Sequence, residues 1–250
     1  MRKLKSFIPV PEIIYKHIRL YRLNRLFLIR LIHLFKNISP KNKICKVCNW
    51  SGKEFVDGTR CPICFSLPRH RLMIHLLKEI DCNKKKILII GPDMPELLIM
   101  KKIKFDSITN LNMENSIFTD VVADITKYSL DKKSFDMVIM WHVLEHIEED
   151  IVAVNNIFNL LRDDGIFLFS VPVFPWGNKV SYIPEYTNLE DKIEKMGHHD
   201  HVLCCGEDYG DRFELIKFKE KRKINVNSFK QKDIDTYHLD INHYAWLFIK

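Results

Sequence analysis

The sequence lacks a long uninterrupted hydrophobic run and has few glycines. Its most apolar stretch, LFLIRLIHLF at residues 26–35, is broken by Arg30 and His33 and is shorter than the roughly 20 residues that a membrane-spanning helix needs. No small-residue cleavage site follows this stretch, so we expect neither a membrane span nor a secretory leader, and we expect a cytoplasmic protein. Only eight of the 250 residues are glycine, and no repeat or low-complexity segment appears. The composition is that of an ordinary globular protein.

Acidic residues are almost absent from the first 44 positions. This segment holds eleven Lys and Arg residues against a single acid, Glu12, a net charge of +10, so the remaining residues carry −3 of the chain's +7. On a helical wheel the arginines and the large apolar residues fall on opposite halves: Arg19, Arg22, Arg25 and Arg30 against Leu20, Phe27, Leu31 and Phe35. The pattern predicts a basic amphipathic helix.

Three roles are open for this basic arm. Residues 13–36 can lie on an anionic membrane surface as a peripheral contact. They can also dock on the rest of the chain or on a second subunit, and the sequence leaves the oligomeric state open. Nucleic-acid binding is disfavoured, because the arm has no aromatic interleaving and no recognition motif.

Four of the seven cysteines form two Cys-x-x-Cys pairs twelve residues apart, and they are Cys45, Cys48, Cys61 and Cys64. Paired motifs of this kind in a reducing compartment more often bind metal than form disulfides. Four thiolates suit tetrahedral zinc and close its coordination sphere, so we predict a structural zinc ribbon and not a reaction centre. The alternatives are four unrelated core cysteines or a thioredoxin-like redox pair, and the redox pair fits poorly because no βαβ pattern follows.

From residue 83 onward, strand-like and helix-like stretches alternate, which is typical of a parallel sheet covered by helices. The predicted strands are residues 85–91, 106–113, 120–125, 134–141, 166–172, 222–227 and 243–250. The predicted helices are residues 66–80, 92–102, 146–165 and 206–216. We therefore expect an α/β fold: a Rossmann-like, doubly wound, mostly parallel seven-stranded sheet, preceded by a small zinc ribbon and a basic N-terminal helix. The expected domains are residues 1–44, 45–82 and 83–250.

In open sheets of this kind, ligands bind beyond the carboxyl ends of the strands. The residues at these ends are 91–93, 112–114, 124 and 141–146. An acid after the second strand typically accepts from ribose hydroxyls, and one after the third can accept from an adenine amine. The residues alone thus indicate an adenosine-containing ligand.

The segment FDMVIMWHVLEHI, residues 135–147, resembles class I S-adenosylmethionine-dependent methyltransferases of the type 11 group. The chain is also similar to bacterial members with a front zinc ribbon, on the elements CPICFSLPRHR, IGPD and DHVLCCGEDYGDR. This resemblance covers roughly residues 45–250. It implies an enzyme that binds S-adenosylmethionine and a structural Zn²⁺.

The resemblance also implies roles for individual residues. Gly91 and Asp93 would line the methionine and ribose side of the cofactor, and Asp124 would receive the adenine amine. The other residues expected at the cofactor are Ile125, Trp141, His142 and His146, with Glu145 nearby at the start of the following helix.

The sequence departs from the family pattern in three places. The usual glycine-rich loop keeps one glycine, which puts cofactor affinity in question. Asn112 stands where an aspartate is common after the second strand, with Glu114 two residues on. Leu203 stands where the segment DHVLCCGEDYGDR would have an arginine in the family, and this departure puts substrate recognition in question.

Methyl transfer requires the nucleophile and the methyl group to be held in line, and a hydroxyl nucleophile also needs a base near neutral pH. Histidine suits that task, and His142 and His201 are the candidates. Each also has a non-catalytic interpretation. His142 can be a polar residue that hydrogen-bonds the backbone at a strand end, and His201 can belong to a solvated loop.

The predicted function is O-methylation of a small-molecule or glycan-type acceptor. The acceptor can be linked to a lipid. The alternatives are an RNA or protein methyltransferase and a non-catalytic binding module. The segment WHVLEH stands where enzymes that methylate base amino groups carry an Asn/Asp-Pro-Pro-Tyr/Phe motif, which argues against base N-methylation.

Overall fold

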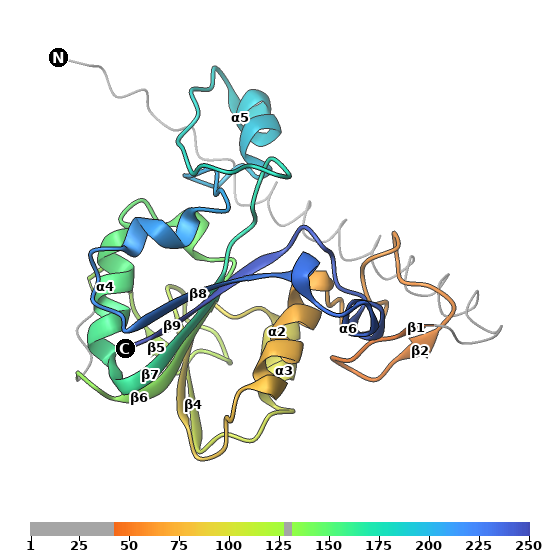
Figure 1. The fold of residues 1–250 in the computed structure, drawn as a ribbon, viewed down its shortest axis with the longest axis horizontal. Coiled ribbons are helices and arrows are strands. Elements are labelled where there is room, and N and C mark those ends of the chain that lie inside the picture. The colour runs from red at the N-terminus through yellow and green to blue at the C-terminus, as the bar shows by residue number, and fades with distance from the viewer. Residues whose placement is uncertain (1–42, 128–131) are drawn as a thin grey trace. The chain divides into compact units, whose positions relative to one another are not determined.

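A computed structural model describes residues 43–127 and 132–250 (Figure 1). The predicted basic helix and the predicted membrane contact of residues 13–36 lie outside the described residues. The chain divides into two compact units, with the boundary between Leu67 and Pro68. The helix that we grouped with the ribbon, up to residue 82, belongs to the larger unit. Each unit is described by itself.

The smaller unit contains a two-stranded antiparallel sheet. Strand β1, Lys43–Ile44, pairs with β2, Ser51–Gly52. The turn between them holds the first Cys-x-x-Cys pair. Such short strands bury little apolar surface, so a segment of this size usually needs a metal or another staple to hold its fold.

The larger unit is built on a seven-stranded sheet in the order β5-β4-β3-β6-β7-β9-β8. Its strands are β3 Lys86–Ile90, β4 Ser107–Asn112, β5 Val121–Val122, β6 Phe135–Trp141, β7 Leu161–Ser170, β8 Glu220–Asn225 and β9 Tyr244–Ile249. Strands β3 to β7 pair in parallel, and β9 runs antiparallel to both β7 and β8. The predicted mostly parallel seven-stranded sheet is confirmed.

Helices cover both faces of this sheet. The helices of the larger unit are α2 Pro68–Glu79, α3 Met94–Met100, α4 Asp150–Leu160, α5 Leu189–Met196 and α6 Gln231–Tyr237, and its 3-10 turns are η1 Leu144–His146, η2 Tyr209–Phe213 and η3 Val226–Ser228. Figure 1 shows α2 and α3 on one face and α4 on the other. Strands β3 and β6 are buried along almost their whole length, as expected of central strands covered on both faces.

Two predicted helices are shorter than the sequence pattern indicated. The run 146–165 becomes helix only at Asp150, because Ile147 has extended backbone angles and separates η1 from α4. The run 206–216 forms only the 3-10 turn η2. There Gly210 packs so closely on β9 that an added Cβ would lie 2.4 Å from a ring atom of Trp246.

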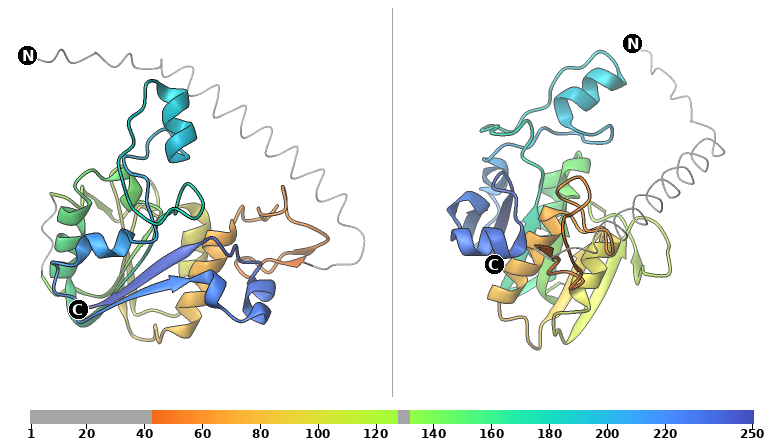
Figure 2. Two further views of the ribbon diagram at one scale, coloured as in Figure 1. Left: turned by 45° about the horizontal axis from the view of Figure 1, so that its top comes forward. Right: turned by 90° about the vertical axis from the view of Figure 1, so that its right-hand side faces the viewer.

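Residues 173–205 form an insertion between β7 and η2 that carries α5. Two bridges close its base, one between Val173 and Cys205 and one between Tyr182 and Cys204. Both views of Figure 2 show α5 standing away from the sheet. The insertion leaves several large apolar side chains at least two-fifths exposed: Trp176, Val180, Tyr182, Ile183, Tyr186, Leu189 and Ile193.

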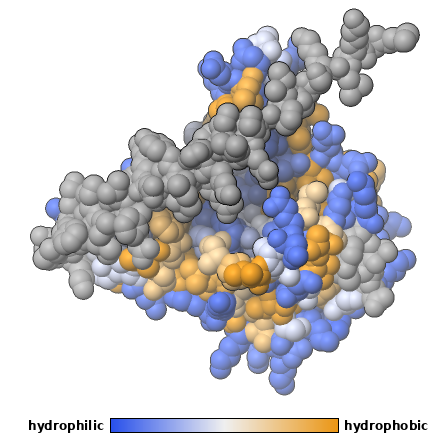
Figure 3. Space-filling model, turned by 180° about the vertical axis from the view of Figure 1, so that it is seen from behind, coloured by the Kyte–Doolittle hydropathy of each residue, from blue (hydrophilic) through white to orange (hydrophobic). Residues whose placement is uncertain are grey.

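Polar and apolar side chains are mixed on the surface, as is usual for a globular protein. On the face drawn in Figure 3, hydrophilic side chains divide the apolar ones into separate patches. Within residues 43–127 and 132–250, no helix combines the length and the hydropathy that crossing a membrane requires.

Candidate functional site

The four predicted zinc ligands lie together in the smaller unit. The sulfur atoms of Cys45 and Cys64 are 3.6 Å apart, as are those of Cys48 and Cys61, and all four sulfurs lie within 4.8 Å of one another. A tetrahedral zinc ion with bonds of about 2.3 Å requires sulfur separations of about 3.8 Å. The donor set and its spacing therefore fit zinc.

The two halves of this cysteine cluster repeat one backbone turn. The amide of Asn49 donates to the carbonyl of Cys45 at 2.7 Å, and the amide of Phe65 donates to that of Cys61 at 3.0 Å. Asn49 and Phe65 both have positive φ angles, 63° and 60°. Each turn brings the two sulfurs of its pair to one side, which is the arrangement of facing zinc knuckles.

The predicted cofactor turn follows β3 in the larger unit. Gly91 has a φ angle of 61°, and a Cβ there would lie 3.0 Å from Cγ2 of Val143. Its amide donates to the carbonyl of Leu111 at 2.8 Å. This glycine is thus at a position where a side chain would be strained and crowded.

Asp93 caps the N-terminus of α3. Its side chain accepts from the amide of Glu96 at 3.1 Å, and the Glu96 carboxylate accepts from the amide of Asp93 at 3.0 Å. Buried His70 lies 3.0 Å and Arg69 lies 3.5 Å from the other carboxylate oxygen. Burial alone would raise the pKa of Asp93, but hydrogen bonding and the charges of His70 and Arg69 lower it overall. Asp93 is therefore a fixed anion that is 41% exposed.

A cavity of about 240 Å³ opens beside this turn. It is lined by Pro92, Asp93, Met94, Leu97, Asn110, Asn112, Ser116, Phe118 and Thr119. Asn112 ends β4, and its side-chain oxygen accepts from the amide of Met113 at 2.9 Å. Glu114 is exposed in the loop that follows. The predicted residues Asp93 and Asn112 thus share one cavity, and Glu114 is absent from its lining.

Asp124 lies after β5, at the same edge of the sheet. One of its oxygens accepts from the amide and the hydroxyl of Thr126, at 2.9 and 2.7 Å. The other lies 3.2 Å from the ammonium of Lys127. The bonds from Thr126, followed by the charge of Lys127, lower the pKa of Asp124. The neighbouring Ile125 is buried in the core at 4% exposure.

His142 directly follows β6 and has a φ angle of 54°, which is rare outside glycine. Its Nδ1 lies 3.5 Å from Oε1 of Glu145. Its Nε2 is buried and has no hydrogen-bond partner among the described residues. Burial, and then the charge of Arg69 and the neighbouring His243, hold the pKa of His142 well below its ordinary value. The imidazole is therefore neutral near pH 7. Trp141, just before it, is 2% exposed.

Glu145 lies at the centre of the histidines. It is 1% exposed, and burial raises the pKa of its carboxyl to about 7. Its Oε1 lies 3.9 Å from Nε2 of His146, and Nδ1 of His146 lies 3.2 Å from Asp200. The turn η1 thus holds a buried carboxylate between two imidazoles.

His201 reaches this group from the insertion. Its Nδ1 donates to the carbonyl of Met196 at 2.7 Å. The next amide, that of Val202, donates to the carbonyl of Glu145 at 2.9 Å and ties the loop to η1. The structure therefore brings together the predicted His142, His146 and His201, which are far apart in the sequence.

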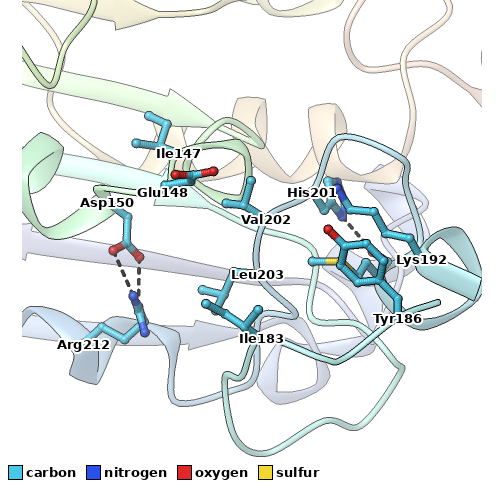
Figure 4. Close-up of a pocket in the computed structure, with 11 residues that line it drawn as sticks. Ile147, Glu148, Asp150, Ile183, Tyr186, Lys192, His201, Val202, Leu203 and Arg212 are labelled. Carbon is cyan, nitrogen blue, oxygen red and sulfur yellow. Dashed lines mark hydrogen bonds and ion pairs between the residues drawn. The ribbon is translucent and has the colours of Figure 1, made fainter. Parts of the chain in front are cut away.

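A second cavity, of about 330 Å³, adjoins His201 (Figure 4). It lies between the start of α4 and the insertion, and it is lined by Ile147, Glu148, Asp150, Ile183, Tyr186, Lys192, Met196, His201, Val202, Leu203 and Arg212. One wall is apolar, while the Tyr186 hydroxyl and the Lys192 ammonium bring polar groups near His201. The cavity can hold a small organic group next to the histidine cluster.

Comparison with known proteins finds similarity to methyltransferases. Residues 98–169 match a family model described as a methyltransferase domain. This match covers less than a third of the chain. It agrees with the fold described above, which a solved S-adenosylmethionine-dependent methyltransferase shares. Comparison with curated proteins gave no match.

Solved structures of methyltransferases are similar to this chain. The S-adenosylmethionine-dependent methyltransferase from Mesorhizobium loti is 11% identical, with a TM-score of 0.50 over 70% of this chain and 96% of its own. A methyltransferase from Archaeoglobus fulgidus is 16% identical, with a TM-score of 0.48 over 72% of this chain and 94% of its own. A further one, from Listeria monocytogenes, is also 16% identical, with a TM-score of 0.48 over 70% and 96%.

Three features of the site were not predicted as such. The sequence placed Glu145 near the cofactor but gave no sign that three histidines surround it. The contact of His70 with Asp93 joins segments that no motif links. His243, whose ring centre is 6.3 Å from that of His142, comes from the turn before β9. A lone histidine a hundred residues away from its neighbour carries no sequence signal.

Proposed function

We propose that this methyltransferase transfers a methyl group to a hydroxyl of a small-molecule or glycan-type acceptor. The observation that carries the proposal is the buried, neutral His142, whose Nε2 has no hydrogen-bond partner in the described part of the chain. A buried polar nitrogen without a partner is costly, so such an atom points to a ligand that supplies one.

S-adenosylmethionine would bind along the carboxyl ends of β3, β4, β5 and β6 and would supply the methyl group from its sulfonium. The turn at Gly91 allows close backbone approach to it. Asp93 and Asn112 line the cavity where a ribose hydroxyl can be held, and Glu114 would contact the cofactor from the exposed loop that follows β4. Asp124 retains one carboxylate oxygen that faces only Lys127 and can accept from the adenine amine.

The remaining predicted cofactor residues would support this site from beneath. Ile125 and Trp141 are buried at 4% and 2% exposure, so they would form its floor by packing. His146 would lie at the cofactor's methyl end, where η1 follows β6.

His142 would accept the acceptor's proton. Its Nδ1 faces Glu145, which fixes the ring and leaves Nε2 for the acceptor, as in other histidine–carboxylate pairs. His201 would act from the opposite side of Glu145, at the mouth of the larger cavity. The acceptor would enter through that cavity, and the exposed apolar residues of the insertion suit an acceptor carried on a lipid.

The smaller unit would bind one structural Zn²⁺ through Cys45, Cys48, Cys61 and Cys64. The sulfur spacing fits a closed tetrahedral site, so the metal would stabilise the ribbon and take no part in methyl transfer. Loss of the metal should therefore unfold the ribbon without changing the chemistry.

Calorimetric titration with S-adenosylmethionine tests the proposal first. Wild-type protein should bind in the micromolar range, and Asp124→Ala should weaken binding by about 1–3 kcal/mol, the usual cost of a buried polar group left unpaired. His142→Gln should still bind the cofactor and yet lose methyl transfer in a screen of hydroxylated glycans with radiolabelled cofactor. The loss expected for a missing general base is about 10²–10⁴-fold. No cofactor binding by the wild type would leave a non-catalytic binding module as the better interpretation.

A further inference from the structure

We propose that Glu145, His146 and His201 bind a divalent transition-metal ion of the zinc type. The three side chains offer one ligand atom each, and these atoms lie within 4.8 Å of one another. The site is separate from the cysteine cluster and uses oxygen and nitrogen donors in place of sulfur. It also goes beyond the proposed methyl transfer, because metal binding can be measured without cofactor or acceptor.

The carboxylate of Glu145 is the first observation that points to a cation site. The residue is 1% exposed, and its Oε2 is buried without a hydrogen-bond partner in residues 43–127 and 132–250. The other oxygen, Oε1, faces the rings of His142 and His146 at 3.5 and 3.9 Å. A buried carboxylate is normally paired or bound to a metal, and Oε2 has neither partner.

His201 is held in the state that a metal ligand needs. Its Nδ1 donates to the carbonyl of Met196 at 2.7 Å, so the proton lies on Nδ1 and the lone pair lies on Nε2. Metal-binding histidines commonly donate their second nitrogen to a backbone carbonyl in this way. The bond from the Val202 amide to the Glu145 carbonyl, at 2.9 Å, fixes the distance between these two ligands.

His146 completes the group and opens it to solvent. Its side chain is 32% exposed, which gives an ion a path of entry. Its Nδ1 lies 3.2 Å from Asp200 but lacks the geometry of a hydrogen bond. Asp200 in turn contacts His198. The outer side of the site therefore carries a second carboxylate that can neutralise the charge of a bound cation.

Two imidazoles and one carboxylate are a usual donor set for zinc and its neighbours in the first transition series. Bonds of about 2.0–2.2 Å would draw the ligand atoms to about 3.4 Å from one another. Three protein ligands leave a position open. His201 also lines the cavity of about 330 Å³, so the open position suits an oxygen of the acceptor, and a bound cation would lower that oxygen's pKa.

Metal content per chain tests the site directly. Full-length protein would be equilibrated with Zn²⁺, freed of excess metal and measured by elemental analysis. The wild type should hold two ions, Cys61→Ser should hold one, and Glu145→Gln and His201→Gln should each hold one. Glu145→Gln keeps the side chain's volume, and circular dichroism would show that it has folded.

Cobalt distinguishes the two sites spectroscopically. Co²⁺ bound to the cysteine cluster gives a thiolate-to-cobalt charge-transfer band in the near ultraviolet, whereas Co²⁺ at the proposed site does not. The second equivalent of Co²⁺ should add only weak visible bands, and these should be lost in Glu145→Gln. A single ion with only the nitrogen and oxygen signature would support this site and contradict the ribbon.

His199→Gln is the matched control. His199 lies in the same loop as His201, is exposed, and belongs to a separate exposed group with His198 and Asp200. This variant should keep both ions. Loss of the second ion in His199→Gln with retention in His201→Gln would move the ion to the exposed loop and overturn the assignment. One thiolate-bound ion in the wild type would overturn it as well.

Discussion

Buried neutral histidines gather where β6 ends. His142 and His243 have ring centres 6.3 Å apart, and burial lowers the pKa of both, that of His243 to about 4. Arg69 adds to the effect on each, because its positive charge opposes a second one nearby. A site kept free of imidazolium suits a cofactor that already carries a positive sulfonium, and it leaves His142 able to accept a proton.

The burial of His243 should make folding sensitive to acid. Its pKa is about 4 in the folded protein and about 6.5 when unfolded. The folded state therefore binds fewer protons in this window, and the stability that His243 contributes above pH 6.5 is lost as the pH falls toward 4. The slope is at most about 1.4 kcal/mol per pH unit. In urea unfolding at pH 7, 6 and 5, His243→Gln should show a flatter dependence than the wild type.

Comparing the wild type with His243→Gln cancels the pH dependence of unfolding that comes from other titrating groups. Glu145, whose folded pKa is raised, gains stability on acidification over part of the same range, but it is present in both. Parallel curves for wild type and His243→Gln would mean that His243 is protonated in the folded protein without penalty.

Among the helices and strands, the sequence predicted best those whose residues are buried on both sides. Strands β3 and β6 are runs of large apolar residues between polar turns, and their pattern leaves little choice. The start of α4 was placed too early, because Glu148 and Glu149 suit a first helical turn by charge, whereas the chain there is fixed by contacts of Asp150 with η2. Such a contact joins residues about sixty positions apart and is not visible in local sequence. Helix α5 was missed because it is short and has one buried residue, Met196.

The Asp150 contact is itself testable. The carboxylate is 2% exposed and accepts from Arg212 at 2.8 and 2.9 Å and from the hydroxyl of Tyr209 at 3.0 Å. Asp150→Asn removes the charge that pairs with the guanidinium, and we expect the free energy of unfolding to fall by about 1–3 kcal/mol. Asp163→Asn, at an exposed pair with Lys133, should leave it unchanged. Equal urea midpoints for Asp150→Asn and the wild type would contradict the expected role.

For the whole molecule, the sequence supplied the parts of the site but not their assembly. The resemblance named His142, His146 and Asp124 one by one, since each follows a strand whose end must lie at the ligand edge. It could not show that the insertion returns His201 to Glu145, because insertions are long and irregular and their path depends on tertiary contacts. The sequence did predict that the four cysteine sulfurs lie together, since both pairs lie within twenty residues of the chain; zinc binding by them stays a prediction.

The cysteine cluster and the cofactor site should be separable in function. All four sulfurs lie in residues 45–64, whereas every proposed cofactor residue and the central strands lie in the unit Pro68–Lys250. Cys61→Ser should therefore lose one zinc ion per chain and still bind S-adenosylmethionine with the wild-type dissociation constant in calorimetry. A matched Cys82→Ser variant, at a buried cysteine outside the cluster, should keep the zinc.

The opposite result would have a definite cause in the chain. Arg69 and His70 follow the second cysteine pair within six residues and hold Asp93, the cap of α3, at the cofactor turn. If Cys61→Ser abolishes cofactor binding, the ribbon orders the start of α2, and Arg69→Met should then reproduce the loss while keeping its zinc. If Arg69→Met binds the cofactor normally, that link is excluded, and the ribbon would have to act on the cofactor site by another route.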